Sequence, residues 1–203
     1  MGELTVTTFV SLDGVMQAPG GPEEDTSGGF THGGWVFPYF EAEGGALIGD
    51  IFARAGAFLL GRTTYEIFAS YRPHASEAEE PVRSALNGLP KYVASTTLGE
   101  ADWGPATIVR DVAAEVPAIK ARTAGELQVH GSAGLLQTLV AHGLVDEYRL
   151  LTFPVVLGAG KRLFGSGAVP ASLELRETRT TPTGVTYSVY RPAGELKTGS
   201  FAG

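Results

Sequence analysis

A glycine followed by an arginine and two threonines is the first group of residues in this chain whose types and spacing suggest chemistry. The run Ala57–Glu66 begins with apolar residues, reaches Gly61, and continues with Arg62, Thr63 and Thr64 into a predicted helix. The first N–H groups of a helix have no partner within it, and the helix dipole adds about half a positive charge there. Arginine forms paired hydrogen bonds with phosphate, and threonine can cap a helix. The turn is therefore suited to a phosphate group, although a capped helix start without a ligand has the same composition.

A second turn rich in small residues lies further along the chain. The sequence Gly131-Ser132-Ala133-Gly134 follows a predicted strand and opens an apolar helix. Small side chains let the backbone approach a pyrophosphate closely, and the Ser132 hydroxyl can donate a hydrogen bond. The spacing differs from the dinucleotide fingerprint G-x-G-x-x-G, and the later GAGKRLF segment lacks the spacing of a nucleoside-triphosphate-binding loop. Together, the two turns favour an anionic cofactor.

Four further residues are candidates for contact with a substrate. Asp13 ends the first predicted strand and either positions a substrate amine or transfers a proton, or it forms a local Asx turn with Gly14. His130 precedes the second turn and is either a ligand contact or a structural histidine. Lys161 and Arg162 either pair with a substrate phosphate or belong to a solvated basic turn.

The remaining candidate groups are less specific. An aromatic cluster near the first third of the chain either stacks on a flat heterocycle or belongs to the core or a dimer interface; it comprises Trp35, Phe37, Tyr39 and Phe40. Ser11 and Ser132 have no histidine–acid relay in their sequence context, which argues against a hydrolase triad. The 4 histidines show no metal-ligand spacing, so no metal site is predicted.

The composition is that of a folded protein with an acidic surface. Of 203 residues, 43% are hydrophobic and 18% are charged, and the formal net charge is −7. Nucleic-acid binding requires a basic face, so a nucleic-acid partner is not expected. No apolar run is long enough to cross a bilayer, and the N-terminus lacks the basic region of a secretory signal. With no cysteine, disulfides are excluded. We expect a cytoplasmic protein without membrane partners.

Alternating strands and helices must position these residues. The predicted strands are 4–12, 57–60, 91–95, 106–109, 127–130, 147–153, 173–179 and 185–190, and the predicted helices are 41–55, 63–70, 76–89, 112–122 and 133–142. Residues 16–34 form a long loop that is a candidate lid. The alternation predicts an α/β fold with a mostly parallel sheet, helices on both faces and a closing antiparallel hairpin. No linker is visible, so residues 1–192 are predicted to be one domain and residues 193–203 a C-terminal tail.

Several segments of the chain, taken in order, resemble one superfamily. They are SLDG, FLLGRTTYE, KYVAS, VHGSAGLLQTL, LVDEYRLLTFPVVLGAGKRLF and the closing hairpin. The chain resembles the dihydrofolate reductase-like proteins, in particular the reductase domain that forms the C-terminal half of the riboflavin-biosynthesis bifunctional deaminase-reductase. The resemblance covers nearly the whole chain and implies the three-layer dihydrofolate reductase-like fold.

The resemblance also implies an oxidoreductase whose cofactor is NADPH. In these proteins the Gly-Arg-x-Thr turn and the late glycine turn hold the cofactor, and a serine after the third strand lies near its adenosine. Carried over, the cofactor-binding residues are Gly61, Arg62, Thr63, Thr64, Ser95, Thr96, Gly131, Ser132, Ala133, Gly134 and Leu135. Asp13 takes a position that lines the active-site cleft and is the candidate catalytic residue, while the candidate substrate-binding residues are His130, Lys161 and Arg162.

The implied reaction is hydride transfer to a small pyrimidine- or pteridine-like heterocycle, similar to that of 5-amino-6-(5-phosphoribosylamino)uracil reductase. The chain departs from that enzyme, which has a glutamate where His130 stands, and without cysteine it has no zinc deaminase half. The acid of true dihydrofolate reductases has no clear equivalent near Gly44 and Gly45. A true dihydrofolate reductase and a non-catalytic dimeric nucleotide-binding protein remain as alternatives. Relatives of this fold form homodimers, and residues 148–156 are a candidate contact.

Overall fold

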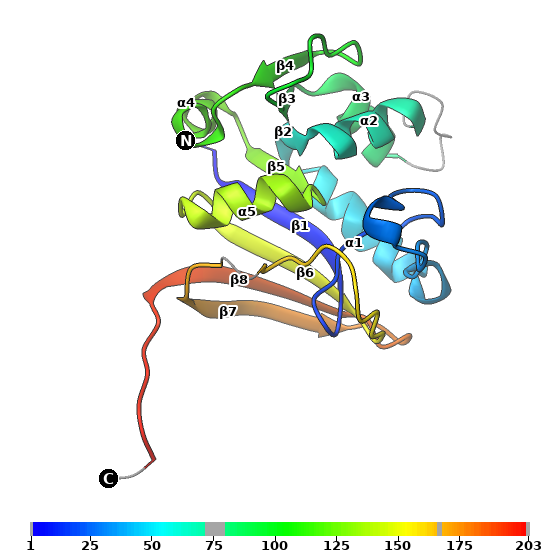
Figure 1. Cartoon of the computed structure of the whole chain (residues 1–203), viewed down its shortest axis with the longest axis vertical. Helices are drawn as coiled ribbons and strands as arrows, with labels where there is room; N and C mark the ends of the chain where they lie inside the picture. Colours follow the sequence, from blue (N-terminus) through cyan, green and yellow to red (C-terminus); the bar gives the residue numbers. More distant parts are fainter. Residues whose placement is uncertain (1, 72–79, 166–167, 202–203) are drawn as a thin grey trace.

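A single mixed sheet organises the molecule. The computed structural model describes residues 2–71, 80–165 and 168–201. Within these ranges eight strands pair in the order β4-β3-β2-β5-β1-β6-β8-β7 (Figure 1). The strands are β1 Leu4–Ser11, β2 Ala55–Gly61, β3 Lys91–Ala94, β4 Ala106–Val109, β5 Glu126–His130, β6 Glu147–Phe153, β7 Ala171–Thr180 and β8 Thr186–Glu195. The helices are α1 Ala42–Phe52, α2 Arg62–Tyr71, α3 Val82–Gly88, α4 Val112–Arg122 and α5 Ala133–Ala141.

The six strands from β4 to β6 run parallel, as the alternation of elements predicts. Parallel strands need long crossover connections, so helices cover both faces of the sheet. Helices α4 and α5 pack on one face, around a core that includes Leu59, Val129 and Leu136 (Figure 1). Helices α1, α2 and α3 cover the other face, where Phe58 and Leu86 are buried. The predicted three-layer arrangement is thus confirmed.

The C-terminal hairpin completes the sheet. Strand β8 pairs antiparallel with β6 and β7, as predicted. The last strand is longer than the predicted 185–190, because residues up to Glu195 find hydrogen-bonding partners on β7, where Ala171 lies opposite Glu195. The sheet therefore extends past residue 192, and the extended tail begins only after Glu195.

Two helices also differ from their predicted bounds. The helix predicted over 41–55 ends at Phe52, because β2 already begins at Ala55. The helix predicted over 76–89 is described as α3 with Pro81 at its N-cap; residues 76–79 lie outside the described part of the chain. The other elements agree to within two residues, so the strand ends that carry the predicted site are where the sequence indicated.

Candidate active site

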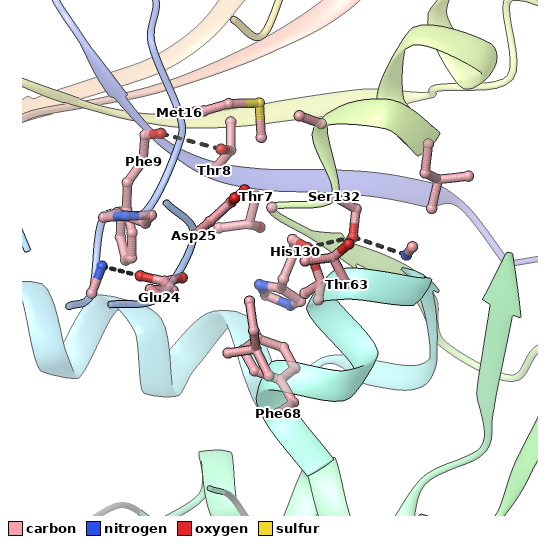
Figure 2. A pocket seen from close by; sticks show the side chains of 18 of the residues that line it. Thr7, Thr8, Phe9, Met16, Glu24, Asp25, Thr63, Phe68, His130 and Ser132 are labelled. Atoms are coloured by element: carbon pink, nitrogen blue, oxygen red, sulfur yellow. Dashed lines mark hydrogen bonds between the residues drawn. The ribbon is translucent and has the colours of Figure 1, made fainter. Parts of the chain in front are cut away.

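One large cleft opens at the carboxyl ends of the parallel strands. Its volume is about 1410 Å³, and Figure 2 shows side chains from β1, α2, β5 and the loop after β1 around it. Ligands of open α/β sheets bind at this edge. The predicted residues that line the cleft are Gly61, Arg62, Thr63, Thr64, Ser95, Thr96, His130, Gly131, Ser132, Ala133, Gly134, Leu135 and Lys161. The fold therefore gathers into one cavity residues that are 100 positions apart in the sequence.

The two glycine turns lie against each other in the cleft wall. The Gly61 N–H donates to Ser132 Oγ at 3.0 Å, and that hydroxyl donates to the His130 carbonyl, also at 3.0 Å. Ser132 has a φ of 62°, a left-handed conformation that is uncommon for a residue with a side chain. A Cβ at Gly61 would lie 3.4 Å from that of Ser132, whereas one at Gly134 would enter open space. The missing side chain at Gly61 therefore makes room for Ser132, and Gly134 presents bare backbone to the cavity.

Two arginines stand at the β3–β4 end of the cleft. Arg62 donates from Nε to Glu66 at 2.7 Å and from Nη1 to the Thr97 hydroxyl at 3.0 Å. Arg110, which follows β4, donates to the carbonyls of Ser95 and Leu98 and also lines the cleft. Since two of the five Arg62 N–H groups are used, its remaining donors can meet a ligand. This end of the cleft has the charge and hydroxyl groups that a phosphate requires.

His130 and Thr7 form the floor at the opposite end. They are register partners on the neighbouring strands β5 and β1, and both line the cleft. The His130 ring stacks on Phe52 of α1, with ring centroids 4.3 Å apart. Below it, the Gln128 amide donates to the Ile51 carbonyl at 2.6 Å and to Glu126 at 2.8 Å. The amide oxygen of Gln128 therefore faces His130 Nε2, 3.0 Å away, which must carry the hydrogen.

The loop after β1 forms the third wall. Residues 16–20 line the cleft together with Glu24 and Asp25, and the predicted role of the loop as a lid stays a prediction. Gln17 anchors it, because its amide donates to the carbonyls of Asp25 and Ser27 and accepts from the Lys161 N–H. Lys161 Nζ lies 2.6 Å from Asp25 Oδ2. Lys161 therefore lines the cleft as predicted, but its ammonium group forms an ion pair with Asp25 of the loop.

Two predicted site residues lie outside the lining of the cleft. Arg162 contacts the carbonyl and the carboxylate of Asp13, and it donates to the Gly158 carbonyl at 2.9 Å. Asp13 accepts from Ser11 Oγ at 2.6 Å and from the N–H groups of Leu157 and Gly158. These hydrogen bonds lower the pKa of Asp13 to about 2, and the bond from Ser11 has the largest effect. Asp13 and Arg162 therefore join the turn after β1 to the segment after β6.

The aromatic cluster divides between core and cleft. Trp35 is buried, and its indole N–H donates to the Gln17 carbonyl while its ring packs edge-on against Phe153. Phe37 and Phe40 line the cleft, and Phe37 is 82% exposed. Residues 148–153 belong to an interior strand whose side chains at Tyr148, Leu151 and Phe153 are buried, so core packing accounts for their apolar character.

Several lining residues carried no signal in the sequence. Thr7 lies within an apolar strand, Glu24 within a polar loop, and Arg110 beside an ordinary strand end, so only their positions in the fold bring them to the cleft. The Asp-Thr-Ser run after Glu24 resembles many surface loops.

Among the residues that the structure describes, no group of three or more His, Cys, Asp or Glu is arranged to hold a metal ion. Over the same residues, no helix has the length and apolar character to span a bilayer.

A comparison with known families agrees with the fold. Residues 3–187 match the model of the RibD C-terminal domain, and the chain belongs to that family. It is 32% identical to the uncharacterized protein YyaP of Bacillus subtilis (strain 168) over 143 residues, which is 70% of this chain and 76% of YyaP.

Two crystal structures share the fold. A candidate riboflavin biosynthesis protein from Shewanella sp. PV-4 superposes with a TM-score of 0.69 at 18% identity, covering 94% of this chain and 98% of the other. A pyrimidine reductase-like protein from Corynebacterium diphtheriae superposes with a TM-score of 0.62 at 14% identity, covering 96% and 93%.

Proposed function

We propose that this protein is an NADPH-dependent reductase of a small pyrimidine- or pteridine-like heterocycle. Membership of the RibD C-terminal domain family supports a reductase-like function. One observation supports the cofactor proposal most strongly. The Gly61–Ser132 hydrogen bond joins the two glycine turns in one wall of the cleft, and Arg62 and Arg110 stand at the end of that cleft. The fold of a pyrimidine reductase-like protein is consistent with this reading.

The residues present fit the proposed cofactor. Bare backbone at Gly134 leaves room for a pyrophosphate, and the N-termini of two helices add favourable dipoles. The Arg62 fork and the hydroxyls of Ser95 and Thr96 suit a 2′-phosphate. In such reductases the nicotinamide supplies the hydride, so the protein binds and aligns the reactants.

The cofactor assignment is tested by replacing Arg62 with alanine. Hydrogen bonds to charged groups contribute about 1.5–3 kcal/mol, so Arg62→Ala should weaken NADPH binding by about ten- to a hundred-fold and NADH binding much less. Isothermal titration calorimetry with both cofactors measures the difference. Arg176→Ala is the matched control, because within the described part of the chain Arg176, on β7, forms an ion pair only with Glu174. Equal losses for NADPH and NADH would contradict the proposed 2′-phosphate contact.

Two alternatives make different predictions. A true dihydrofolate reductase would oxidise NADPH with dihydrofolate. A non-catalytic nucleotide-binding protein would bind NADPH without oxidising it in the presence of any pterin, pyrimidine or flavin. Absence of binding by either nicotinamide cofactor would exclude the reductase proposal itself.

A further inference from the structure

The charged residues of the cleft are divided between its two ends. Arg62 and Arg110 contact the segment after β3, whereas Glu24 and Asp25 belong to the loop after β1 and line the same cleft as Thr7 (Figure 2). Because β2 and β5 separate β3 from β1 in the sheet, the arginines and the acids lie at opposite ends of the cavity. If the arginine end holds the cofactor, the acidic end is left for the substrate.

The acidic end has little positive charge to offer a ligand. Lys161 is paired with Asp25 at 2.6 Å, and Arg162 is bonded to Asp13 outside the lining. Glu24 accepts only the backbone N–H groups of Gly20 and Gly21, at 2.5 and 3.2 Å, among the contacts described. Burial raises the pKa of the Glu24 carboxyl, and the neighbouring Asp25 acts in the same direction. A phosphate dianion here would meet like charge, whereas an N–H donor would meet an acceptor.

Thr7 is a second and independent indication of a ligand at this end. Its side chain is 3% exposed, and its Oγ1 has no hydrogen-bonding partner within the described residues. The neighbouring hydroxyls do have partners, since Thr5 donates to Glu126, Thr8 to the Phe9 carbonyl and Ser11 to Asp13. Buried polar groups in folded proteins are nearly always hydrogen-bonded. A hydroxyl on the cleft floor beside His130 is therefore placed to bond a polar atom of a bound molecule.

We propose that the substrate is an unphosphorylated nitrogen heterocycle whose exocyclic amino group faces Glu24 and whose ring lies on Thr7 and His130. The assignment of the acidic end of the cleft to the substrate rests on the proposed reductase function. The inference separates this chain from a reductase of phosphoribosyl substrates, because the basic residues that would hold a ribose phosphate are tied to Asp25 and Asp13. Thr7 and Glu24 then decide which heterocycles bind.

Four small probes test the proposal on protein saturated with NADP⁺, which occupies the arginine end. Calorimetric titrations compare cytosine with uracil, which lacks the exocyclic amine, and cytidine with cytidine 5′-monophosphate. We expect cytosine to bind about tenfold more tightly than uracil, and the monophosphate to bind no more tightly than cytidine. Tighter binding of the monophosphate, or no binding of any probe at millimolar concentration, would overturn the proposal.

Two isosteric variants assign the contacts. Glu24→Gln should weaken cytosine about tenfold and change uracil little. Thr7→Val should weaken both bases while raising the urea midpoint of the free protein, since it removes a buried unpaired hydroxyl. The controls are Glu23→Gln, an exposed neighbour outside the lining, and Thr5→Val, a buried threonine two register positions from Thr7 on the same strand. Unchanged cytosine binding in both test variants would refute the assignment.

The two proposals fail in different ways. If NADP⁺ does not bind the wild-type protein, the reductase proposal fails whatever the probes do. If NADP⁺ binds in an Arg62-dependent way and the monophosphate is the preferred probe, the reductase proposal stands and the unphosphorylated substrate is rejected.

Discussion

At the scale of single residues, Asp13 shows how one side chain changes role between sequence and structure. Its place at the end of β1 suggested catalysis, yet its carboxylate accepts hydrogen bonds from Ser11, Leu157 and Gly158 and contacts Arg162. A carboxylate with these partners holds two segments together and is stabilised in its charged form. Thr7, an unremarkable residue in the sequence, stands on the floor of the cleft instead.

The role of Asp13 predicts a specific dependence of stability on pH. Its pKa in the folded protein, about 2, is below the ordinary value of 3.8. The stabilisation is therefore fully present above that ordinary value and is lost as the pH falls toward the folded pKa. Urea unfolding of Asp13→Asn should show a lower midpoint than wild type at neutral pH and a smaller difference at about pH 3. Glu174→Gln, on the exposed strand β7, is the control, and a difference that grows at low pH would contradict the assignment.

At the scale of elements, the site depends on how β5 passes into α5. Gly131 and Ser132 both have positive φ, so the chain turns sharply before the helix begins. This turn brings the Ser132 hydroxyl to the end of β2, where it joins the two turns. The strand-to-helix geometry therefore sets both the helix N-terminus and the cleft wall.

Two substitutions at Ser132 separate its hydroxyl from its backbone conformation. Ser132→Ala and Ser132→Gly both lose the hydrogen bonds to Gly61 and His130, at a cost of roughly 0.5–1.5 kcal/mol for each bond. Only glycine relieves the left-handed conformation, so Ser132→Ala should be less stable than Ser132→Gly by about 1 kcal/mol in urea unfolding. An alanine variant as stable as the glycine variant would show that the turn relaxes to another conformation.

At the scale of the whole molecule, a buried network of charges crosses the sheet. Arg149 on β6 bonds Glu126 on β5 at 2.7 and 2.8 Å and Glu147 on its own strand at 2.7 Å. Arg191 on β8 continues the network from Glu147 to Glu3. Burial disfavours the charge of Arg149, but the hydrogen bonds that Arg149 donates to Glu126 and the negative charges of Glu126 and Glu147 outweigh this effect and raise the pKa of Arg149. The network joins the parallel part of the sheet to the hairpin.

Removing the central arginine should therefore affect the whole fold. Arg149→Leu removes the arginine shared by the buried carboxylates of Glu126 and Glu147 and leaves them only the more exposed Arg54 and Arg191, so it should cost up to about 3–5 kcal/mol. Arg176→Leu, which breaks an exposed pair on β7, should cost at most about 1 kcal/mol. Equilibrium urea unfolding measures the free energy of unfolding of both variants. Similar losses for the two would show that the buried network stabilises the fold no more than an exposed ion pair does.

The homodimer stays a prediction, and the exposed edge of the sheet at β7 is a surface on which to test it. Strand β7 is an edge strand and exposes Leu173 and Leu175 at 39% and 51%. Exposed edges with apolar side chains are ready to pair with another chain. We expect sedimentation equilibrium to show a dimer for the wild type and a monomer for Leu175→Glu. Glu174→Gln serves as the neighbouring control, and a dimer that survives Leu175→Glu would place the contact elsewhere.

What the sequence determined by itself was local. Apolar runs that end in glycine specify strand ends, and small or hydroxyl residues after them specify helix starts, so the turns at Gly61 and Gly131 and nearly all elements could be predicted. The resemblance carried by these same segments also identified the family.

The tertiary structure alone decided which residues share the cleft and which pair elsewhere. Thr7, Glu24 and Arg110 come from a strand, a loop and a strand end that give no distinguishing pattern, and only the strand order brings them to one cavity. Lys161 and Arg162 are adjacent in the sequence, yet one faces the cleft beside Asp25 and the other bonds Asp13. Local sequence cannot distinguish these cases, since side-chain direction and partner depend on residues about 140 positions away.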